Sequence, residues 1–362
     1  MTTQQSTAMQ TETFKSFAAK ILSGTATAII VSLLPNAILA NLIKYLPAVE
    51  WLTDLNRILV IFQYFLPIMA GFLIAENFKL TSMQQVAVGG AAYIGSGAWT
   101  WRFFDTVQES GKALEAVGLF QLRGLGDIIN MMITATLAVL LAKWIGDRLG
   151  SLTIVLLPII VGIGVGYLGW LMLPYVSQVT TLIGQAINSF TVLQPVLMSV
   201  LIAMSFAVLI VTPISTVGIG VAIGLTGLSA GAAAIGVAAT STYLALATAR
   251  KNKAGVPAAI LLGATKMMMP NVAANPIMLL PILVTAAVSA LSVPLFNVIG
   301  TPATAGFGFI GLIGPLASLE TTGIAMMIII WFVIPFAVAY LCHYLCLNVF
   351  KLYSDDIFIF EK

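Results

Sequence analysis

A lysine and two asparagines stand out in the apolar stretch "LLGATKMMMPNVAANPIMLLP", where Lys266 is followed by Asn271 and Asn275. An ionisable side chain inside a membrane costs about 2.5–3.5 kcal/mol on insertion scales, so its presence indicates a function or a specific partner. A cation beside two amides suits an anionic or strongly polar solute. The alternative is that Lys266 extends from a short interfacial helix into water.

A second charged candidate is Glu320, which follows "GPLASL". Its carboxylate could neutralise Lys266 or bind a cation. The alternative is an ordinary acid near the start of a helix, where the helix dipole favours a negative charge. If Lys266 binds the solute, replacing it with methionine is expected to abolish uptake without lowering membrane expression.

Two Gly-rich segments repeat one pattern, "TPISTVGIGVAIGLTGL" from Thr212 and "TPATAGFGFIGLIGPL" from Thr301. Each follows an amide–proline pair that opens an apolar run, Gln194-Pro195 before the first and Asn275-Pro276 before the second. The distribution of basic residues makes the two units run in opposite directions across the membrane. Inverted repeats with interrupted helices place the substrate site of many transporters near the middle of the bilayer.

The repeats therefore predict two re-entrant hairpins in an inverted repeat. Non-helical backbone survives in a membrane only where protein or a water-filled cavity surrounds it, and glycines supply the backbone freedom that such hairpins need. The alternative is that these glycines form close-packed seams between helices. We expect hairpin glycines at Gly218, Gly220, Gly306 and Gly308, and a substrate site formed by Gln194, Thr212, Lys266, Asn271, Asn275, Thr301, Thr304 and Glu320.

Residues for covalent chemistry are scarce. His343 is the only histidine, and it lies near the end of the last apolar run with Tyr340 and Tyr344, as in an interfacial aromatic belt. Cys342 and Cys346 are expected to act as small apolar residues, because no further cysteine or nearby ligand completes a metal site. We therefore expect no catalytic residue, no metal and no cofactor, and leave open whether the chain works within an enzyme complex.

The composition makes the lipid bilayer the solvent for most of the chain. Of 362 residues, 60% are hydrophobic and only 8% are charged, far fewer charges than in soluble proteins. The formal net charge of +3 is too small and too scattered for nucleic-acid binding. Apolar runs of spanning length and shorter Gly-rich or Met-rich pieces predict an all-α polytopic membrane protein with about ten membrane elements. The runs cover 18–43, 57–76, 83–101, 126–145, 152–174, 195–212, 230–249, 276–299 and 321–350.

Charges divide the chain into two parts, because most loop charges lie in residues 1–150 and none occurs from Ser151 to the "RKNK" cluster. We expect a first helical bundle at 1–175 that acts as a dimerisation scaffold, an interfacial connector at 176–193, and a substrate-binding transport domain at 194–362. Basic residues flanking the runs place the N-terminus in the cytoplasm. The charged segment 102–127 is interpreted as a solvated loop.

The stretch Asn275–Leu316 resembles the membrane (IIC, or EIIC) subunit of bacterial sugar phosphotransferase systems, in particular the branch with perfringolysin-regulator-like and fructose-type proteins. The order of runs from Gln194 onward fits this family more loosely. The resemblance implies a homodimeric permease in the bacterial plasma membrane, with cytoplasmic N- and C-termini. Its C-terminal half would hold the substrate between two re-entrant hairpins, and a separate IIB-type phosphocarrier would be its partner.

The sequence departs from that family at two places. In better-known members a Glu-Pro motif before the "NP" run supplies a sugar-binding glutamate, and a histidine on another hairpin assists. Here Thr265 and Lys266 occupy the place of the acid, and His343 lies near the C-terminus. We therefore expect an elevator-type permease for a small polar solute, a sugar or an anionic sugar-like compound, without obvious phosphotransfer residues. The alternative is a non-transporting membrane regulator derived from the same fold.

Overall fold

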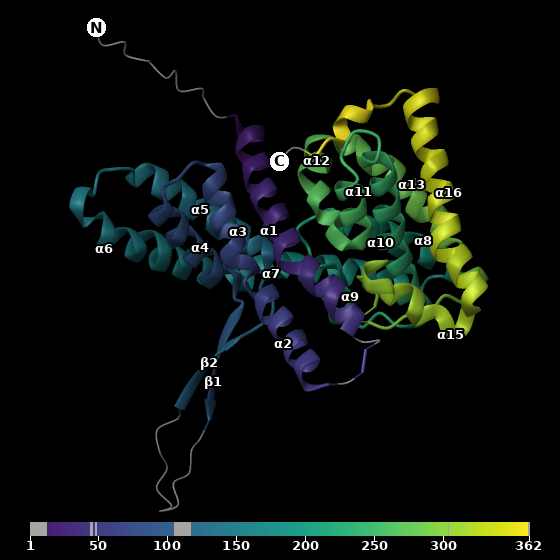
Figure 1. The fold of residues 1–362 in the computed structure, drawn as a ribbon, viewed down its shortest axis with the longest axis horizontal. Helices are drawn as coiled ribbons and strands as arrows, with labels where there is room; N and C mark the ends of the chain where they lie inside the picture. The colour runs from purple at the N-terminus through teal and green to yellow at the C-terminus, as the bar shows by residue number, and fades with distance from the viewer. Residues whose placement is uncertain (1–12, 44–45, 48, 105–116, 303, 361–362) are drawn as a thin grey trace, which may run out of the picture.

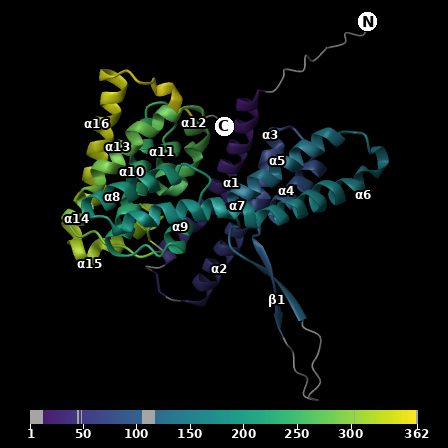
Figure 2. The same ribbon diagram turned by 180° about the vertical axis from the view of Figure 1, so that it is seen from behind.

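The computed structural model describes residues 13–43, 46–47, 49–104, 117–302 and 304–360. In this part of the chain, two helical bundles are linked by the long helix α7 (Val165–Asn188), as Figures 1 and 2 show. The start of the first helix and the C-terminal segment lie at the same end of the molecule, which we call the terminal side. A β-hairpin projects from the opposite end (Figure 1).

The first bundle consists of apolar helices that pack through small residues. Its buried apolar side chains form one cluster between Ile21 and Val165. Glycines allow close approach here, since an added Cβ on Gly71 would lie 2.8 Å from the Cα of Gly89. The elements are α1 (Phe14–Ile43), α2 (Glu50–Tyr64), α3 (Leu66–Asn77), α4 (Ser82–Ser96), α5 (Ile128–Ile145), α6 (Thr153–Leu157) and the π-helical segment Pro158–Gly164 that leads into α7.

Two antiparallel strands lie within 99–122, so the expected all-α class is wrong in this detail. The expected solvated loop 102–127 is wrong where it overlaps the strands, and its residues 105–116 lie outside the described residues. β1 (Trp99–Phe104) pairs with β2 (Val117–Leu122), and Trp101 lies opposite Phe120. Their ring centroids are 5.8 Å apart in an edge-on arrangement. The many aromatic residues of β1 favour a strand, and of the charges that suggested a loop only Arg102 lies within the two strands.

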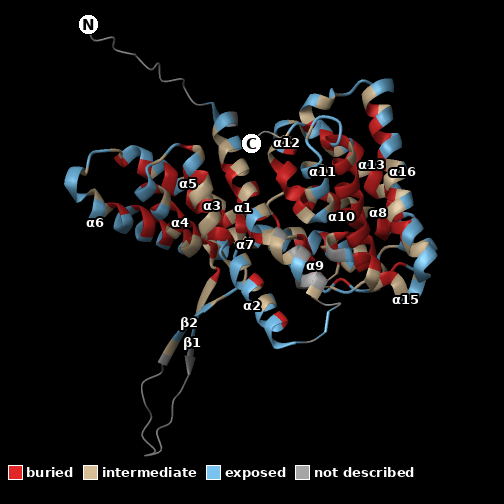
Figure 3. Cartoon of the chain, in the orientation of Figure 1, coloured by how far each residue is buried: buried red, intermediate tan, exposed pale blue. Residues whose placement is uncertain are grey.

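The second bundle is built around one helix, α10 (Gly227–Thr248), which is buried along nearly its whole length (Figure 3). Its alanines and glycines let neighbouring helices approach closely, and an added Cβ on Gly236 would lie 2.7 Å from the Cα of Ala203. The other helices are α8 (Pro195–Leu209), α9 (Thr216–Ala222), α11 (Gly255–Ala259), α12 (Met269–Ala274), α13 (Leu279–Ala290), α14 (Ser292–Leu295), α15 (Ile313–Ile328) and α16 (Ile334–Tyr344).

Several helices have the length and apolarity of membrane spans. Among the described residues, seven helices qualify, or eight if the bent pair α2 and α3 is one span. That pair meets at 43°, and Pro67 lies in the first turn of α3, where the missing N–H is tolerated. Every apolar run predicted from the sequence contains a helix. The predicted polytopic membrane class is therefore confirmed.

The expected connector is helical. Residues 176–193 form the second half of α7 and a short 3-10 turn, Ser189–Val192. Gly184 of α7 lies against Ile219 of α9 and against Ile223, which directly follows α9 in the second bundle. Most of the buried apolar residues from Ile187 onward belong to a second cluster. Helix α7 therefore extends from one packed bundle to the other.

Candidate functional site

A cavity of about 240 Å³ lies where the two bundles meet. One wall comes from α1, α2, α5 and the residue Leu125. The other wall comes from the second bundle, through parts of 210–218, 263–266 and 306–310. We call this space the inter-bundle cavity. Most of its lining is apolar, and its polar side chains are those of Asn36, Gln63, Ser215, Thr216 and Lys266.

A broken helical segment forms part of the second wall. Helix α11 continues into a π-helical turn (Ile260–Ala264) and a 3-10 turn (Thr265–Met268) before α12 begins. The break lies at Gly263, whose φ of 125° is costly for residues with a side chain. An added Cβ there would also lie 2.8 Å from Ile310. Glycine at this position therefore permits the bend that precedes Lys266.

The ammonium of Lys266 is held by backbone carbonyls at the end of α8. The residue is 7% exposed, and its Nζ donates to Leu209 O at 3.4 Å, to Ile214 O at 2.8 Å and to Thr212 O. The end of a helix carries unpaired carbonyls and a partial negative charge, which a cation stabilises. An ammonium has three hydrogens, so these three carbonyls use its full donor capacity. Lys266 therefore supports the wall of the cavity.

The two Gly-rich repeats contact each other beside the cavity. The hydroxyl of Thr216 donates to Gly306 O at 3.0 Å. Gly227 and Gly300 form an antiparallel bridge with two N–H···O bonds of 3.0 Å. Gly306 must lack a side chain, because an added Cβ would overlap the backbone of Val217. Part of the irregular backbone is thus paired within protein, as such backbone requires at membrane depth.

An amide pair lies on the first-bundle wall. The side-chain amide of Asn36 in α1 donates to Gln63 Oε1 in α2. Asn36 Oδ1 is buried and has no hydrogen-bond partner within the described part of the chain. Sequence reasoning missed both residues, because it weighed charges and repeats. The available signal was an amide inside one apolar run and another early in the next, where an unpaired polar group is costly.

Three of the residues predicted for the site line the inter-bundle cavity, namely Lys266, Gly218 and Gly306. Thr212 is next to the cavity through its carbonyl, which accepts a hydrogen bond from the Lys266 ammonium. Gly220 and Gly308 are buried in packing contacts. An added Cβ would lie 2.9 Å from Ala305 Cβ at the first and 2.8 Å from Ala238 N at the second.

Three of the predicted amides lie away from this cavity. Gln194 is exposed at the start of α8, where its Oε1 accepts from the N–H of Val196 at 3.1 Å. Asn271 and Asn275 border a separate hollow on the terminal side. The amide of Asn275 donates to Asn271 O at 3.3 Å. The "amide–proline" pairs that open the repeat units are therefore not brought together.

The last three predicted residues also lie outside the cavity lining. Thr304 Oγ1 accepts from Thr301 N at 2.8 Å and donates to Thr301 O at 3.0 Å, which closes a local turn. Glu320 is exposed on α15. The ammonium of Lys266 contacts backbone carbonyls, so its partner differs from the Glu320 carboxylate that we expect from the sequence.

Comparison with protein-family models identifies the family described as "Phosphotransferase system, EIIC", whose model matches residues 19–360. The match covers both bundles and is far broader than the resemblance carried by Asn275–Leu316. Comparison with curated proteins and with solved structures gave no significant match. EIIC proteins are the membrane components of sugar-transporting phosphotransferase systems and work with the other components of those systems. From Ala19 to Phe360, this chain belongs to the EIIC family of the phosphotransferase system.

Proposed function

We propose that this EIIC protein carries a small polar solute, of the neutral sugar or sugar-alcohol class, through the inter-bundle cavity. The observation that carries the proposal is the place of the cavity, at the boundary between two separately packed bundles and against both Gly-rich repeats. Transporters with inverted repeats bind their substrates at this kind of boundary. The contact between Thr216 and Gly306 supports the interpretation of the repeats as re-entrant hairpins.

The charge of the lining favours a neutral solute over an anionic one. Lys266 is the cationic side chain of the lining, and its three hydrogens are directed to carbonyls. The remaining polar groups are the hydroxyls of Ser215 and Thr216 and the amides of Asn36 and Gln63. Hydroxyls and amides both donate and accept, as sugar hydroxyls do. We assign solute recognition to these four side chains and a supporting role to Lys266.

Transport follows from a movement of the second bundle against the first. The domain 194–362 moves as an elevator, the bundle 1–175 is the scaffold, and 176–193 connects them. The separate apolar clusters support this division, because each bundle keeps its own core when the boundary shifts. The connecting helix α7 reaches both cores and is suited to guide the movement.

The setting of the protein follows from its family and its charges. We infer a homodimer in the bacterial plasma membrane, formed through the first bundle, with a separate IIB-type phosphocarrier as partner. The terminal side is cytoplasmic in this proposal. It carries Arg250 and Lys251, which pair with acids of the C-terminal segment, and cytoplasmic loops are enriched in such basic residues. The fructose-type, perfringolysin-regulator-like branch stays a prediction.

Uptake into proteoliposomes tests the proposed function. The purified protein is supplied with a panel of radiolabelled hexoses, hexitols and disaccharides, with and without a phosphorylated IIB-type partner. We expect uptake of at least one neutral compound. Gly306→Ala should lower uptake about tenfold, since overpacking at this level costs about 1–3 kcal/mol. Thr216→Val keeps the shape but removes both the bond to Gly306 and one of the four proposed recognition groups, so it should also lower uptake.

Gly255→Ala is the matched control, because an added Cβ there meets no atom within 4 Å. Uptake by this variant should stay within about twofold of the unmodified protein, as for surface substitutions. Well-folded protein that takes up none of the compounds would favour the non-transporting regulator. That alternative is consistent with Lys266 standing where related proteins have an acid. Uptake of an anionic sugar alone would contradict the assignment of a neutral solute.

A further inference from the structure

A second hollow, of about 290 Å³, is lined by segments that lie on the terminal side of the molecule (Figure 1). Three segments line it: α1, α12 with Asn275, and the C-terminal segment Leu352–Phe360, which we call the strap. Its polar lining residues are Ser23, Asn271, Asn275 and Asp356. This hollow is therefore a polar space between the two bundles, with the end of the chain as one of its walls.

The hollow and the inter-bundle cavity lie along one seam. On α1, Ser23 and Ala26 line the hollow and Leu33 lines the cavity, with Ile29 and Ile30 between them also at the cavity. Steps of three or four residues keep these side chains on one helix face. The facing segment follows in the opposite order, with 263–266 at the cavity and 270–275 at the hollow. Ser23 and Leu33 are about 15 Å apart along the helix axis.

Two asparagines hold the strap by its backbone. Asn252 donates to Phe358 O at 2.9 Å and accepts from Phe360 N at 2.8 Å. Asn271 donates to Ile357 O at 2.9 Å and to Ile359 O at 2.7 Å. These bonds fix the stretch of the strap that borders the hollow. They also use both amide hydrogens of Asn271, one of the residues that the sequence predicts for solute binding.

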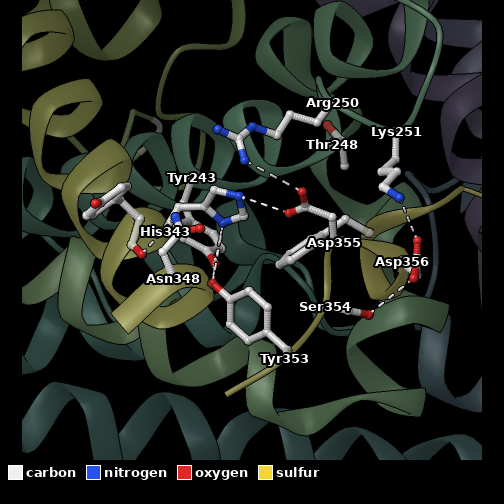
Figure 4. A network of polar contacts seen from close by, with 12 residues as sticks. Tyr243, Thr248, Arg250, Lys251, His343, Asn348, Tyr353, Ser354, Asp355 and Asp356 are labelled. Carbon is white, nitrogen blue, oxygen red and sulfur yellow. Dashed lines mark hydrogen bonds and ion pairs between the residues drawn. The ribbon is translucent and has the colours of Figure 1, made fainter. Parts of the chain in front are cut away.

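The strap is anchored in the second bundle by a buried ring cluster (Figure 4). Phe358 is fully buried and packs edge-on against Tyr243 of α10 and His343 of α16. The Tyr353 hydroxyl lies 2.6 Å from that of Tyr243, and Asp355 lies 3.3 Å from His343. His343, expected in an interfacial belt, is thus buried beneath the strap. In this closed position the strap is therefore packed on the second bundle, while α1 belongs to the first.

We propose that the hollow is an exit vestibule, which holds the solute at a second binding site, and that the strap is its gate. This inference rests on the proposed function, since the same neutral, hydroxyl-rich solute would occupy both spaces. When the strap opens, Asn271 loses two backbone acceptors, and its amide can donate to solute hydroxyls instead. While the gate is closed, the strap carbonyls accept the hydrogen bonds that the solute would accept from Asn271.

The reactivity of a cysteine in the vestibule tests whether the strap opens as a gate, and this test does not require the solute to be known. Cys342→Ala and Cys346→Ala remove the two native cysteines, and Ser23→Cys adds one reporter of nearly the same shape. We measure the rate at which a membrane-impermeant maleimide alkylates it in detergent-solubilised protein. Asn252→Ala removes two hydrogen bonds to the strap and should raise this rate about tenfold. That change is equivalent to lowering the free energy of gate opening by about 1.4 kcal/mol. The control is Asn348→Ala, in the π-helical turn Leu345–Val349 that follows α16. Asn348 is exposed and donates to Tyr344 O at 3.3 Å rather than to the strap, so this variant should leave the rate unchanged.

Equal alkylation rates in the Asn252→Ala and control proteins would contradict the proposal that the strap is a gate. Uptake of the radiolabelled sugar panel then tests the vestibule, because a bulky group attached at Ser23→Cys should block uptake by at least about tenfold. Full uptake after complete alkylation would overturn the vestibule. Absence of uptake before alkylation would contradict a transport role for both the inter-bundle cavity and the vestibule. The alkylation rates would still decide whether the strap is a gate.

Discussion

At the scale of single residues, Lys266 shows how a correct signal can lead to a different role. Its charge at membrane depth indicates a specific partner, and the structure provides one in three carbonyls near the end of α8. A sequence does not reveal this partner, because any residue type carries a carbonyl and only the fold brings the end of α8 to Lys266. Residue type indicated that the charge at this position needs a partner but not which atoms it contacts.

We expect Lys266→Met to lower stability as well as uptake. The variant leaves buried carbonyls without a donor, at a cost of about 1–3 kcal/mol for an unsatisfied group. Thermal unfolding in detergent should show a lower Tm than for Lys253→Met, which removes an exposed cation from the neighbouring loop. Lys266→Arg keeps a charged donor and should recover part of the Tm. An unchanged Tm with lost uptake would return Lys266 to the role of a solute ligand.

At the scale of elements, the sequence predicted the helices better than the contacts between irregular segments. Long apolar runs and the Gly-rich repeats were identified because lipid and close packing each require a particular composition. The pairing of Gly227 with Gly300 and the β-hairpin depend on partners distant in the chain, so local patterns did not show them. The strap was missed for the same reason, because the last twelve residues of the sequence, "KLYSDDIFIFEK", which contain it, resemble an ordinary polar tail.

The strap also contains an exposed ion pair with a defined pH range. Lys251 Nζ lies 2.9 Å from Asp356 Oδ1. The hydrogen bond from Lys251 lowers the pKa of Asp356, and the same contact raises the pKa of Lys251. The lowered pKa means that the contribution of Asp356 is complete above about 3.9 and is lost as the pH falls through the lowered pKa. The contribution of Lys251 is complete below about 10.4 and is lost as the pH rises through the raised pKa.

We therefore expect the difference in strap protection between the wild type and Asp356→Asn to be constant from about pH 5 to pH 9. Hydrogen exchange of the peptide that covers 350–360 measures it, and the ratio of the two proteins at each pH removes the intrinsic pH dependence of exchange. High salt should reduce the difference, because the pair is exposed. A change within this range would instead indicate that another group, such as His343 beside Asp355, controls the strap.

At the scale of the whole molecule, the two bundles and the seam between them are the feature on which the proposed function depends. The charge distribution predicted a division of the chain, and the two apolar clusters fall on either side of α7. The sequence did not predict that α1 forms one side of the seam along its length. Its periodic apolar pattern is equally suited to lipid, to a neighbouring helix and to a solute path.

If transport requires the bundles to move past each other, a tether across the inter-bundle cavity should stop it. Leu33 and Ile310 line opposite walls, one in each bundle. We expect a reducible bismaleimide between Leu33→Cys and Ile310→Cys, in the background without native cysteines, to lower sugar uptake to the level of empty proteoliposomes. Reduction of the linker should restore uptake, which separates the tether from the substitutions themselves.

A tether within the second bundle provides the matched control. The Thr240 hydroxyl of α10 lies 3.5 Å from the Ala207 carbonyl of α8, so a disulfide between Thr240→Cys and Ala207→Cys joins two helices that move together. Uptake should survive this bond, because an elevator movement leaves the interior of the moving bundle unchanged. Undiminished uptake with the Leu33–Ile310 tether in place would mean that the solute crosses between stationary bundles. The cavity and the vestibule would then be parts of a fixed channel, and the strap alone would control passage.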